Sequence, residues 1–331
     1  MKNNLQAIAK QLMTPGKGIL AADESIGSVD QRFAPHGIAN NEENRRQFRL
    51  LYLASPGIEK HLSGVIMHEE TILQEANRNL TFSSLLAGIG VLPGVKVDLG
   101  LVKLPNFAGE TVTQGLDSLP ERLQEFTNLG LKFTKWRAAF SIDDEKHLPT
   151  DQSILANIHA LTRYSLLVQE FGMVPIVEPE VLLVGNHSLE KSAEVLGRVL
   201  RLLFEHLHYY HVDLTGLILK TSMVIPGKDY QQPCTSEQVA AATVGVLNQY
   251  VPPQTAGVVF LSGGQTPSQA KDNLHAIVNL GPQPWPLTFS FARALQEPAL
   301  DVWQGKIANF NAGQAKFLET LGANTAALQA D

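Results

Sequence analysis

The feature that most constrains the fold of this chain is the alternation of short apolar segments with longer stretches of helical periodicity. The apolar segments carry Val, Ile, Leu and Phe at successive positions, which is typical of parallel strands covered on both faces. Strands and helices that alternate along a chain form a parallel sheet with its helices on the outside. The eight predicted strands span residues 18–23, 62–69, 94–100, 132–140, 173–181, 216–224, 257–263 and 286–294.

Eight such units in 331 residues predict an α/β fold of the (β/α)8 TIM barrel type. Asn41, Ser188, Thr235 and Thr266 each stand at the start of a helical stretch, as helix-capping residues do. No linker or shift in composition divides the chain. We therefore expect a single domain over residues 1–331, with a short N-terminal helix and a C-terminal helical tail. The predicted outer helices span residues 41–53, 115–129, 154–170, 189–206, 236–250 and 268–279, and residues 70–94 are predicted to add a hairpin or loop.

The overall charge and the cysteine content narrow the classes of function. A net charge of −6 provides no concentrated basic face, so a nucleic-acid partner is not expected. Cys234 is the only cysteine, which excludes an intrachain disulfide and favours a reducing compartment. No apolar stretch has the length of a transmembrane span, so no membrane partner is expected either. These observations predict a soluble cytoplasmic protein.

Three predicted strands carry two charged residues at positions two apart, which places both members of each pair on one face of the strand. Burying six charges costs too much free energy for packing alone to explain them. In a barrel of this type, the active site lies at the carboxyl ends of the strands, so we expect a polar pocket there. The pairs are Lys96 with Asp98, Lys135 with Arg137, and Glu178 with Glu180, and further charges near strand ends are Asp23, Lys220 and Arg293.

Lys220 is the predicted nucleophile of this pocket. It follows an apolar run in the sixth strand, and alternate strands share an interior layer, so Lys135 of the fourth strand is expected to face it. A lysine that is partly desolvated among other cations loses its proton more readily and attacks carbonyl carbons. Carboxyl groups of the fifth strand are expected between the two lysines, where they would transfer protons. The alternative is a buried ion-pair network that only closes the barrel, which the number of converging charges disfavours.

Two further groups of residues predict sites for phosphate. Ser262, Gly263 and Gly264 follow the seventh strand, where backbone amides can approach an anion closely, and Arg293 comes from the next strand. Phosphate sites recur at this position in such barrels. Two phosphate sites on either side of a reactive lysine fit a bisphosphorylated ketose or its two halves. The second group follows the first strand, with one lysine across the pocket, and comprises Ser25, Ser28, Arg32 and Lys96.

Seven motifs follow one another along the chain: GKGILAADES (16–25), NRRQFR (44–49), KWR (135–137), VPIVEPE (174–180), ILK (218–220), FLSGGQ (260–265) and LTFSFARALQ (287–296). Together they resemble the class I fructose-1,6-bisphosphate aldolases, and the resemblance runs from about Gly16 to Gly322. The resemblance implies a (β/α)8 barrel enzyme, usually a homotetramer, that needs no metal or other cofactor. It implies reversible cleavage of fructose 1,6-bisphosphate to dihydroxyacetone phosphate and glyceraldehyde 3-phosphate, a step of glycolysis and gluconeogenesis.

The resemblance also implies a role for each matching residue. Lys220 would form the iminium with the ketone carbon, and Asp23 would take the hydroxyl proton during carbon–carbon cleavage. Glu178 would act as general acid and base, with Glu180 and Lys135 completing its electrostatics. The residues implied to hold one phosphate are Ser262, Gly263 and Arg293, and those implied to contact the other end of the sugar are Ser25, Ser28, Arg32, Lys96 and Arg137.

The sequence also departs from the family's motifs. Gln31 precedes Arg32 where a second cation is common, so a weaker grip on the distal phosphate is expected. Ala292 replaces a glycine before Arg293. Thr221 and Ser222 follow Lys220 where many relatives carry Pro-Asn, so the loop beyond the lysine is expected to differ.

Other functions remain as alternatives. A deoxyribose-phosphate aldolase or a transaldolase also uses a Schiff base, but two phosphate sites disfavour chemistry on a monophosphate. An inactive binding protein on the same scaffold is disfavoured by the intact Lys220, Asp23 and Glu178. The role of His68, near the pocket, is open, and no metal site is predicted from the histidines that precede the sixth strand at the opposite face.

Overall fold

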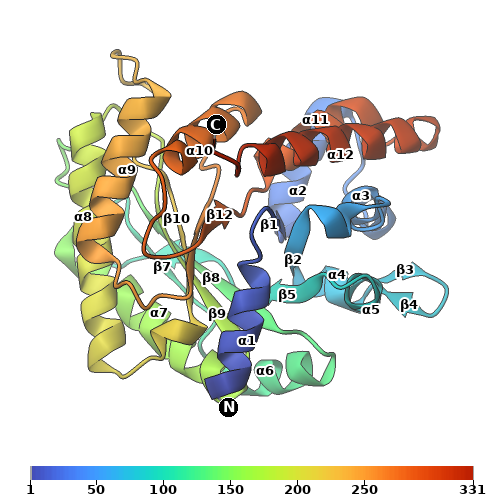
Figure 1. The fold of residues 1–331 in the computed structure, drawn as a ribbon, viewed down its shortest axis with the longest axis horizontal. Coiled ribbons are helices and arrows are strands. Elements are labelled where there is room, and N and C mark those ends of the chain that lie inside the picture. The colour runs from blue at the N-terminus through green and yellow to red at the C-terminus, as the bar shows by residue number, and fades with distance from the viewer. Residues whose placement is uncertain (1, 331) are drawn as a thin grey trace.

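The computed structural model describes residues 2–330, and within them eight parallel strands form a barrel (Figure 1). Neighbouring strands pair in the order β1-β2-β5-β8-β9-β10-β11-β12. The ring is nearly closed between its last and first members, because the carbonyl of Phe291, just beyond β12, accepts a hydrogen bond from the amide of Ala21 at 3.0 Å. The predicted (β/α)8 barrel is therefore confirmed. The strands are β1 (Gly18–Ala22), β2 (Leu62–Met67), β5 (Leu92–Lys96), β8 (Phe133–Phe140), β9 (Val174–Val181), β10 (Ile218–Thr221), β11 (Gly257–Phe260) and β12 (Leu287–Phe289).

Several strands end earlier than the sequence predicts. Asp98 lies beyond β5, and the predicted strand 286–294 is wrong at its end, because Arg293 is the first residue of helix α11 (Arg293–Trp303). His68 lies beyond β2, and its ring accepts a hydrogen bond from the amide of Glu70 at 3.2 Å as the cap of helix α4 (Glu69–Leu73). An apolar run shows where a segment is buried, whereas strand pairing stops sooner, where the chain turns into the next loop.

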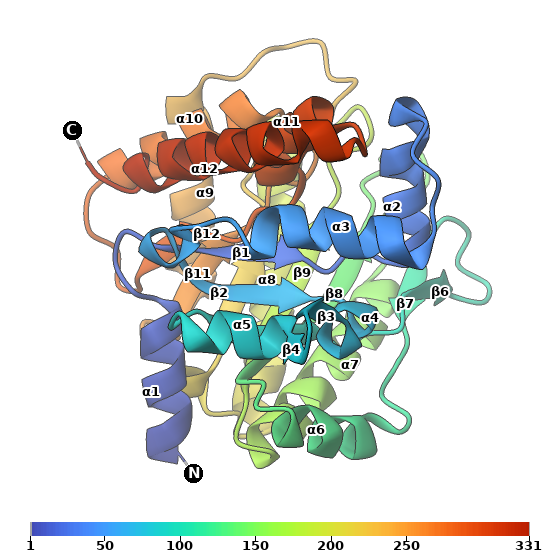
Figure 2. The same ribbon diagram turned by 90° about the vertical axis from the view of Figure 1, so that its right-hand side faces the viewer.

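The helices surround the barrel on its outside (Figures 1 and 2). The predicted caps are confirmed, because the side chains of Asn41, Ser188, Thr235 and Thr266 each accept a hydrogen bond from a backbone amide three residues later. None of the described helices is long and apolar enough to span a membrane. The remaining helices are α1 (Lys2–Leu12), α2 (Ile26–Phe33), α3 (Glu42–Leu53), α5 (Phe82–Gly88), α6 (Leu119–Asn128), α7 (Asp151–Glu170), α8 (Leu189–Tyr209), α9 (Ser236–Tyr250), α10 (Pro267–Asn279) and α12 (Phe310–Ala326), with 3-10 turns η1 (Ala34–His36), η2 (Ile58–Lys60), η3 (Leu214–Gly216) and η4 (Ile307–Asn309).

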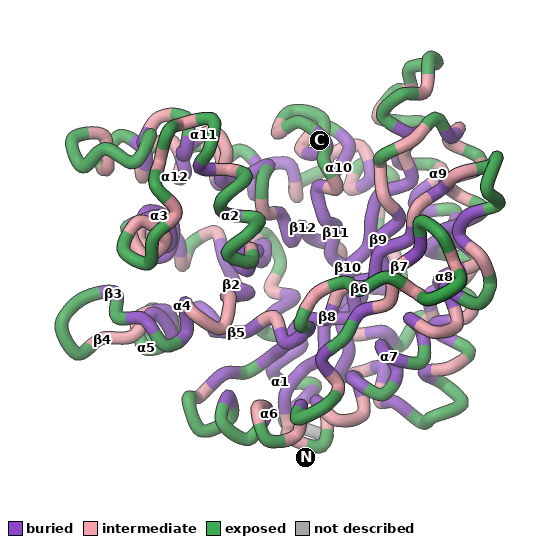
Figure 3. Tube along the Cα trace, turned by 180° about the vertical axis from the view of Figure 1, so that it is seen from behind, coloured by how far each residue is buried: buried purple, intermediate pink, exposed green. Residues whose placement is uncertain are grey.

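An apolar core closes one end of the barrel. Helix α1 lies at that end, opposite α2 (Figure 2), and its Leu5, Ile8 and Leu12 pack with Phe133 from the barrel interior. A Cβ atom at Gly94 would come within 2.5 Å of the Phe133 ring, so glycine is required for the ring to fill this space. A second core lies between the strands and the outer helices, and the strands are buried along most of their length (Figure 3). The barrel interior is therefore accessible only from the carboxyl ends of its strands.

Two hairpins stand outside the barrel. The pair β3 (Glu75–Asn77) and β4 (Leu80–Thr81) confirms the extra hairpin expected within residues 70–94. The pair β6 (Leu101–Lys103) and β7 (Thr111–Thr113) was not predicted, because β6 is exposed along its length and has no alternation of apolar residues. This second hairpin lies at the carboxyl ends of the barrel strands (Figure 2).

Candidate active site

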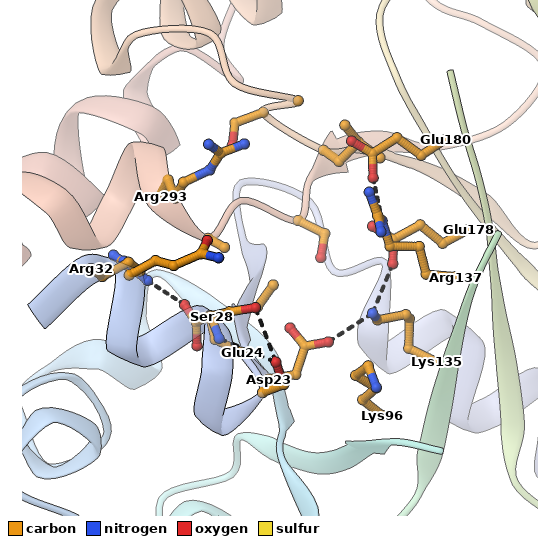
Figure 4. Close-up of a pocket in the computed structure, with 18 of the residues that line it drawn as sticks. Asp23, Glu24, Ser28, Arg32, Lys96, Lys135, Arg137, Glu178, Glu180 and Arg293 are labelled. Carbon is orange, nitrogen blue, oxygen red and sulfur yellow. Dashed lines mark hydrogen bonds and ion pairs between the residues drawn. The ribbon is translucent and has the colours of Figure 1, made fainter. Parts of the chain in front are cut away.

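A cavity of about 1050 Å³ opens at the carboxyl ends of the barrel strands. Arg293 and Arg32 lie on one side of it, and Lys135 and Glu178 lie on the other (Figure 4). Apart from Gly264 of the predicted phosphate turn, every residue predicted from the sequence as catalytic or substrate-binding lines this one cavity, so the structure brings the candidate site together. These residues are Asp23, Ser25, Ser28, Arg32, Lys96, Lys135, Arg137, Glu178, Glu180, Lys220, Ser262, Gly263 and Arg293.

A chain of four buried charges crosses the base of the cavity. The ammonium nitrogen of Lys135 lies 2.7 Å from Asp23 Oδ2 and 3.0 Å from Glu178 Oε2. The other oxygen of Glu178 lies 3.1 Å from the ammonium nitrogen of Lys220. The expected position between the two lysines is therefore confirmed for Glu178 but wrong for Glu180, the other carboxylate of the fifth strand, which pairs with Arg137 instead. Each lysine is supplied by its own strand, β8 or β10, and Glu178 by the strand β9 between them.

Electrostatic interactions among these four side chains determine the protonation states of Asp23, Glu178 and Lys135. Burial alone would raise the pKa of Asp23, but Lys135 and Lys220 hold it well below its usual value. Burial likewise opposes ionisation of Glu178, and the same two lysines lower its pKa. Burial acts against the charge of Lys135, yet Asp23 and Glu178 raise its pKa. At neutral pH, Asp23 and Glu178 are therefore carboxylates and Lys135 is an ammonium ion.

Two further ion pairs lie beside these four buried side chains. Arg137 Nε contacts Glu180 Oε2 at 2.5 Å, and although burial acts against the guanidinium charge, Glu180 raises the pKa of Arg137. The backbone amide of Arg137 donates to Asp98 at 3.2 Å, and the other oxygen of Asp98 lies 2.8 Å from the ammonium nitrogen of Lys96. Glu180 and Asp98 thus hold Arg137 and Lys96 in place on one wall of the cavity.

Arg32 is held by two neighbours on the opposite wall. Its Nη1 lies 2.5 Å from Glu24 Oε1 and 2.5 Å from the side-chain oxygen of Gln296. The other oxygen of Glu24 pairs with Arg49 of helix α3. Ser25 caps helix α2 by accepting from the amide of Ser28 at 3.3 Å. Of the predicted distal phosphate contacts on this wall, Arg32 therefore already has a carboxylate partner.

The predicted phosphate site beside the ketone has a different environment. Gly263 and Gly264 adopt left-handed backbone conformations, with φ of 58° and 96°, in the turn after β11. Arg293 begins helix α11, and a Cβ atom at Gly264 would lie 3.5 Å from its guanidinium. Among residues 2–330, Arg293 has no carboxylate partner. Its charge is therefore not compensated by another side chain.

Several residues that line the cavity were missed at the sequence level. Ser290 is buried after β12, and within the described chain its hydroxyl has no hydrogen-bond partner. His36 and Asp301 lie at the rim, with Nε2 and Oδ1 3.4 Å apart. Glu24 follows Asp23 directly, and its position at the end of the first strand is the sole signal in the sequence that could have pointed to it. A serine or an exposed acid carries no periodic signal, so only the three-dimensional arrangement identifies these residues.

The loop after β10 is tied to the end of the neighbouring strand β9. Thr221 and Ser222 follow Lys220, and the hydroxyl of Ser222 accepts a hydrogen bond from the amide of Val181 at 3.0 Å. This bond joins the ends of β9 and β10, which carry Glu178 and Lys220.

Among residues 2–330, no group of three or more His, Cys, Asp and Glu side chains is arranged to hold a metal ion.

Comparison with known proteins decides the family. A family model described as fructose-bisphosphate aldolase class-I matches residues 4–331. The chain belongs to the class I fructose-bisphosphate aldolase family. It is therefore a glycolytic lyase of the metal-independent class, as the motifs indicated.

Individual relatives match over most of their length. The chain is 44% identical to fructose-bisphosphate aldolase of Dictyostelium discoideum, with 98% of this chain and 91% of that protein covered. It is 47% identical to cytosolic fructose-bisphosphate aldolase 5 of Arabidopsis thaliana, over 96% of this chain and 88% of that protein. A solved structure of fructose-bisphosphate aldolase from Plasmodium falciparum, in complex with TRAP and a small-molecule inhibitor, superimposes with a TM-score of 0.97. That protein is 42% identical, and the match covers 98% of this chain and 94% of the other.

Proposed function

We propose that this protein cleaves fructose 1,6-bisphosphate through a Schiff base formed by Lys220. The observation that carries the proposal is the position of Glu178, whose carboxylate lies 3.1 Å from Lys220 and 3.0 Å from Lys135 in the buried base of the cavity. Formation of a Schiff base needs a lysine beside a group that accepts and returns protons. Glu178 supplies that group for Lys220.

The first stage joins the substrate to the protein. Glu178 accepts the ammonium proton of Lys220, and the neutral amine attacks the ketone carbon to give a carbinolamine. Glu178 then returns a proton to the carbinolamine hydroxyl, which leaves as water, while the nitrogen lone pair forms the iminium. Lys135 stays protonated beside Glu178 and favours its carboxylate form before the first transfer and after the second.

The second stage breaks the carbon–carbon bond. Asp23 accepts the proton of the C4 hydroxyl, the C3–C4 bond breaks, and its electron pair moves to the iminium to give an enamine. Glyceraldehyde 3-phosphate leaves as the aldehyde. Protonation of the enamine at C3 and hydrolysis of the iminium then release dihydroxyacetone phosphate and restore Lys220. Asp23 suits this step because Lys135, at 2.7 Å, favours its ionised form.

The two phosphates of the sugar are proposed to bind on either side of Lys220. The phosphate next to the ketone binds at the turn after β11 and the guanidinium of Arg293, whose charge is otherwise uncompensated. The distal phosphate lies beside the start of helix α2, where backbone amides favour an anion. The proposed contacts are Ser262, Gly263 and Arg293 for the first phosphate, and Ser25, Ser28, Arg32, Lys96 and Arg137 for the distal end of the sugar.

We further propose that residues 1–331 form one domain that assembles as a homotetramer in the cytosol. The support for the cytosol is that two relatives from Arabidopsis thaliana are named as cytosolic enzymes. Light scattering coupled to size-exclusion chromatography measures the assembly directly, and a monomer or dimer at working concentration would contradict the tetramer.

The proposed reaction is tested by assaying triose phosphate release from fructose 1,6-bisphosphate. The wild type should release both trioses, whereas Lys220→Ala should abolish release. Lys228→Ala is the matched control, because Lys228 is an exposed lysine that does not line the cavity, and this variant should keep wild-type activity. Full activity in Lys220→Ala would contradict the proposal.

A further inference from the structure

The outer half of the cavity is a slot between two helical faces. On helix α11, Arg293, Glu297 and Asp301 stand four residues apart, which places them along one side of the helix, and all three line the cavity. The facing wall is formed by α2 and η1, where Gln31 and His36 line the same space. The slot therefore carries one cation and two carboxylates in sequence along α11, with the carboxylates toward its outer end.

Fixed contacts join the two walls of the slot. Gln296 accepts from Arg32 through its side-chain oxygen at 2.5 Å and donates to the carbonyl of Ala21 at 2.8 Å. The hydroxyl of Tyr52 donates to the carbonyl of Gln296 at 3.2 Å. At the rim, His36 and Asp301 approach to 3.4 Å. Two of these contacts hold helix α11 against α2 and η1, and the other two hold it against β1 and α3. Glu297 and Asp301 therefore keep their places along the wall of the slot.

The cations on the distal side already have carboxylate partners. Glu24 pairs with both Arg32 and Arg49, and Lys96 pairs with Asp98 at 2.8 Å. Gln31 adds no charge to the wall of α2. In contrast, Arg293 has no carboxylate partner among residues 2–330. A phosphate at the ketone end thus meets a free cation, whereas a phosphate at the distal end meets paired cations and the added charges of α11.

We propose that Glu297 and Asp301 are specificity-determining residues that lower the preference for a bisphosphorylated sugar over its 1-monophosphate. Their carboxylates repel the distal phosphate through the slot and leave the phosphate at the ketone end, beside Arg293, much less affected. The inference rests on the proposed function, because it assigns a substrate preference to the same site. It predicts efficient cleavage of fructose 1-phosphate, whose distal end carries a neutral hydroxyl.

The test compares kcat/KM for fructose 1,6-bisphosphate and fructose 1-phosphate in the double variant Glu297→Gln, Asp301→Asn. At low ionic strength, the ratio of bisphosphate to monophosphate should rise about three- to tenfold, the size expected for removing two charges several ångströms from a phosphate. At about 1 M salt the rise should largely disappear, because the charges are screened. Asp30→Asn is the matched control on helix α2, since Asp30 is exposed and does not line the cavity, and it should leave the ratio unchanged.

The single variant Glu297→Gln separates electrostatics from structure, because it leaves the contact between His36 and Asp301 intact and should give part of the same rise. An unchanged ratio in the double variant, or equal changes for both sugars, would overturn the inference while the proposed function stands. A wild type that cleaves neither sugar would overturn the proposed function, and this inference with it.

Discussion

The ammonium group of Lys135 lies between two buried carboxylates, 2.7 Å from Asp23 and 3.0 Å from Glu178. Glu178 in turn contacts Lys220 at 3.1 Å. The proposed proton acceptor for bond cleavage and the proposed acid and base of Schiff-base formation are therefore both held by one lysine. A change at any of these four residues alters the charge felt by the others, so their effects on the rate should not be additive.

Replacing Glu178 by Gln should lower kcat for fructose 1,6-bisphosphate by roughly 10²- to 10⁴-fold, the usual contribution of general acid and base catalysis. The Gln side chain cannot take the proton of Lys220, whereas the proposed phosphate contacts are untouched, so KM should change little. Steady-state kinetics with Glu145→Gln, an exposed glutamate outside the cavity, provide the control. A Glu178→Gln variant with near-normal kcat would remove Glu178 from the mechanism.

The two proposed phosphate sites should respond differently to loss of an arginine. Arg293→Ala should weaken turnover of both fructose 1,6-bisphosphate and fructose 1-phosphate, because both carry the phosphate next to the ketone. Arg32→Ala should affect mainly the bisphosphate. Each loss should be about ten- to hundredfold in kcat/KM, the range for one charge-assisted hydrogen bond. Equal losses on the two sugars in Arg32→Ala would exclude the distal assignment.

The lowered pKa of Asp23 predicts a pH dependence of stability. A carboxyl group whose folded pKa lies below its unfolded value of 3.8 stabilises the protein above that pH and loses this contribution as the pH falls toward the folded value. Asp23→Asn lacks this titration. The difference in free energy of unfolding between wild type and variant should be constant from about pH 5 to 7 and should shrink below about pH 4. Denaturant unfolding at a series of pH values measures it, and a difference that grows in acid would contradict the assigned sign.

Removal of divalent metal should leave the activity unchanged. In the proposed reaction the iminium nitrogen accepts the electrons of the broken C3–C4 bond, so no Lewis acid is required for that step. Assays after extensive dialysis against EDTA check this, with and without added Zn²⁺ or Mg²⁺. Loss of activity that either ion restores would point to a different electron sink.

The sequence predicts most of this architecture because buried strands and helices carry apolar residues at regular spacings. The strands around Lys135, Glu178 and Lys220 were found from their apolar neighbours, and the spacing of two placed the paired charges on the cavity side. The β6–β7 hairpin was missed because the residues of β6 are exposed and show no regular spacing of apolar residues. Contacts between distant segments were missed for a different reason. Arg32 was predicted as a contact to the distal end of the sugar, but its bond to Gln296 depends on how α2 and α11 pack, which no local pattern encodes.

The most direct test of the central claim is reduction with borohydride in the presence of dihydroxyacetone phosphate, followed by peptide mass mapping. Borohydride converts an iminium into a stable secondary amine, so the lysine that forms the Schiff base acquires a permanent mass label. This treatment should inactivate the protein irreversibly and leave the label on Lys220. A label on Lys96 or Lys135, or no label while the protein still cleaves the sugar, would contradict it.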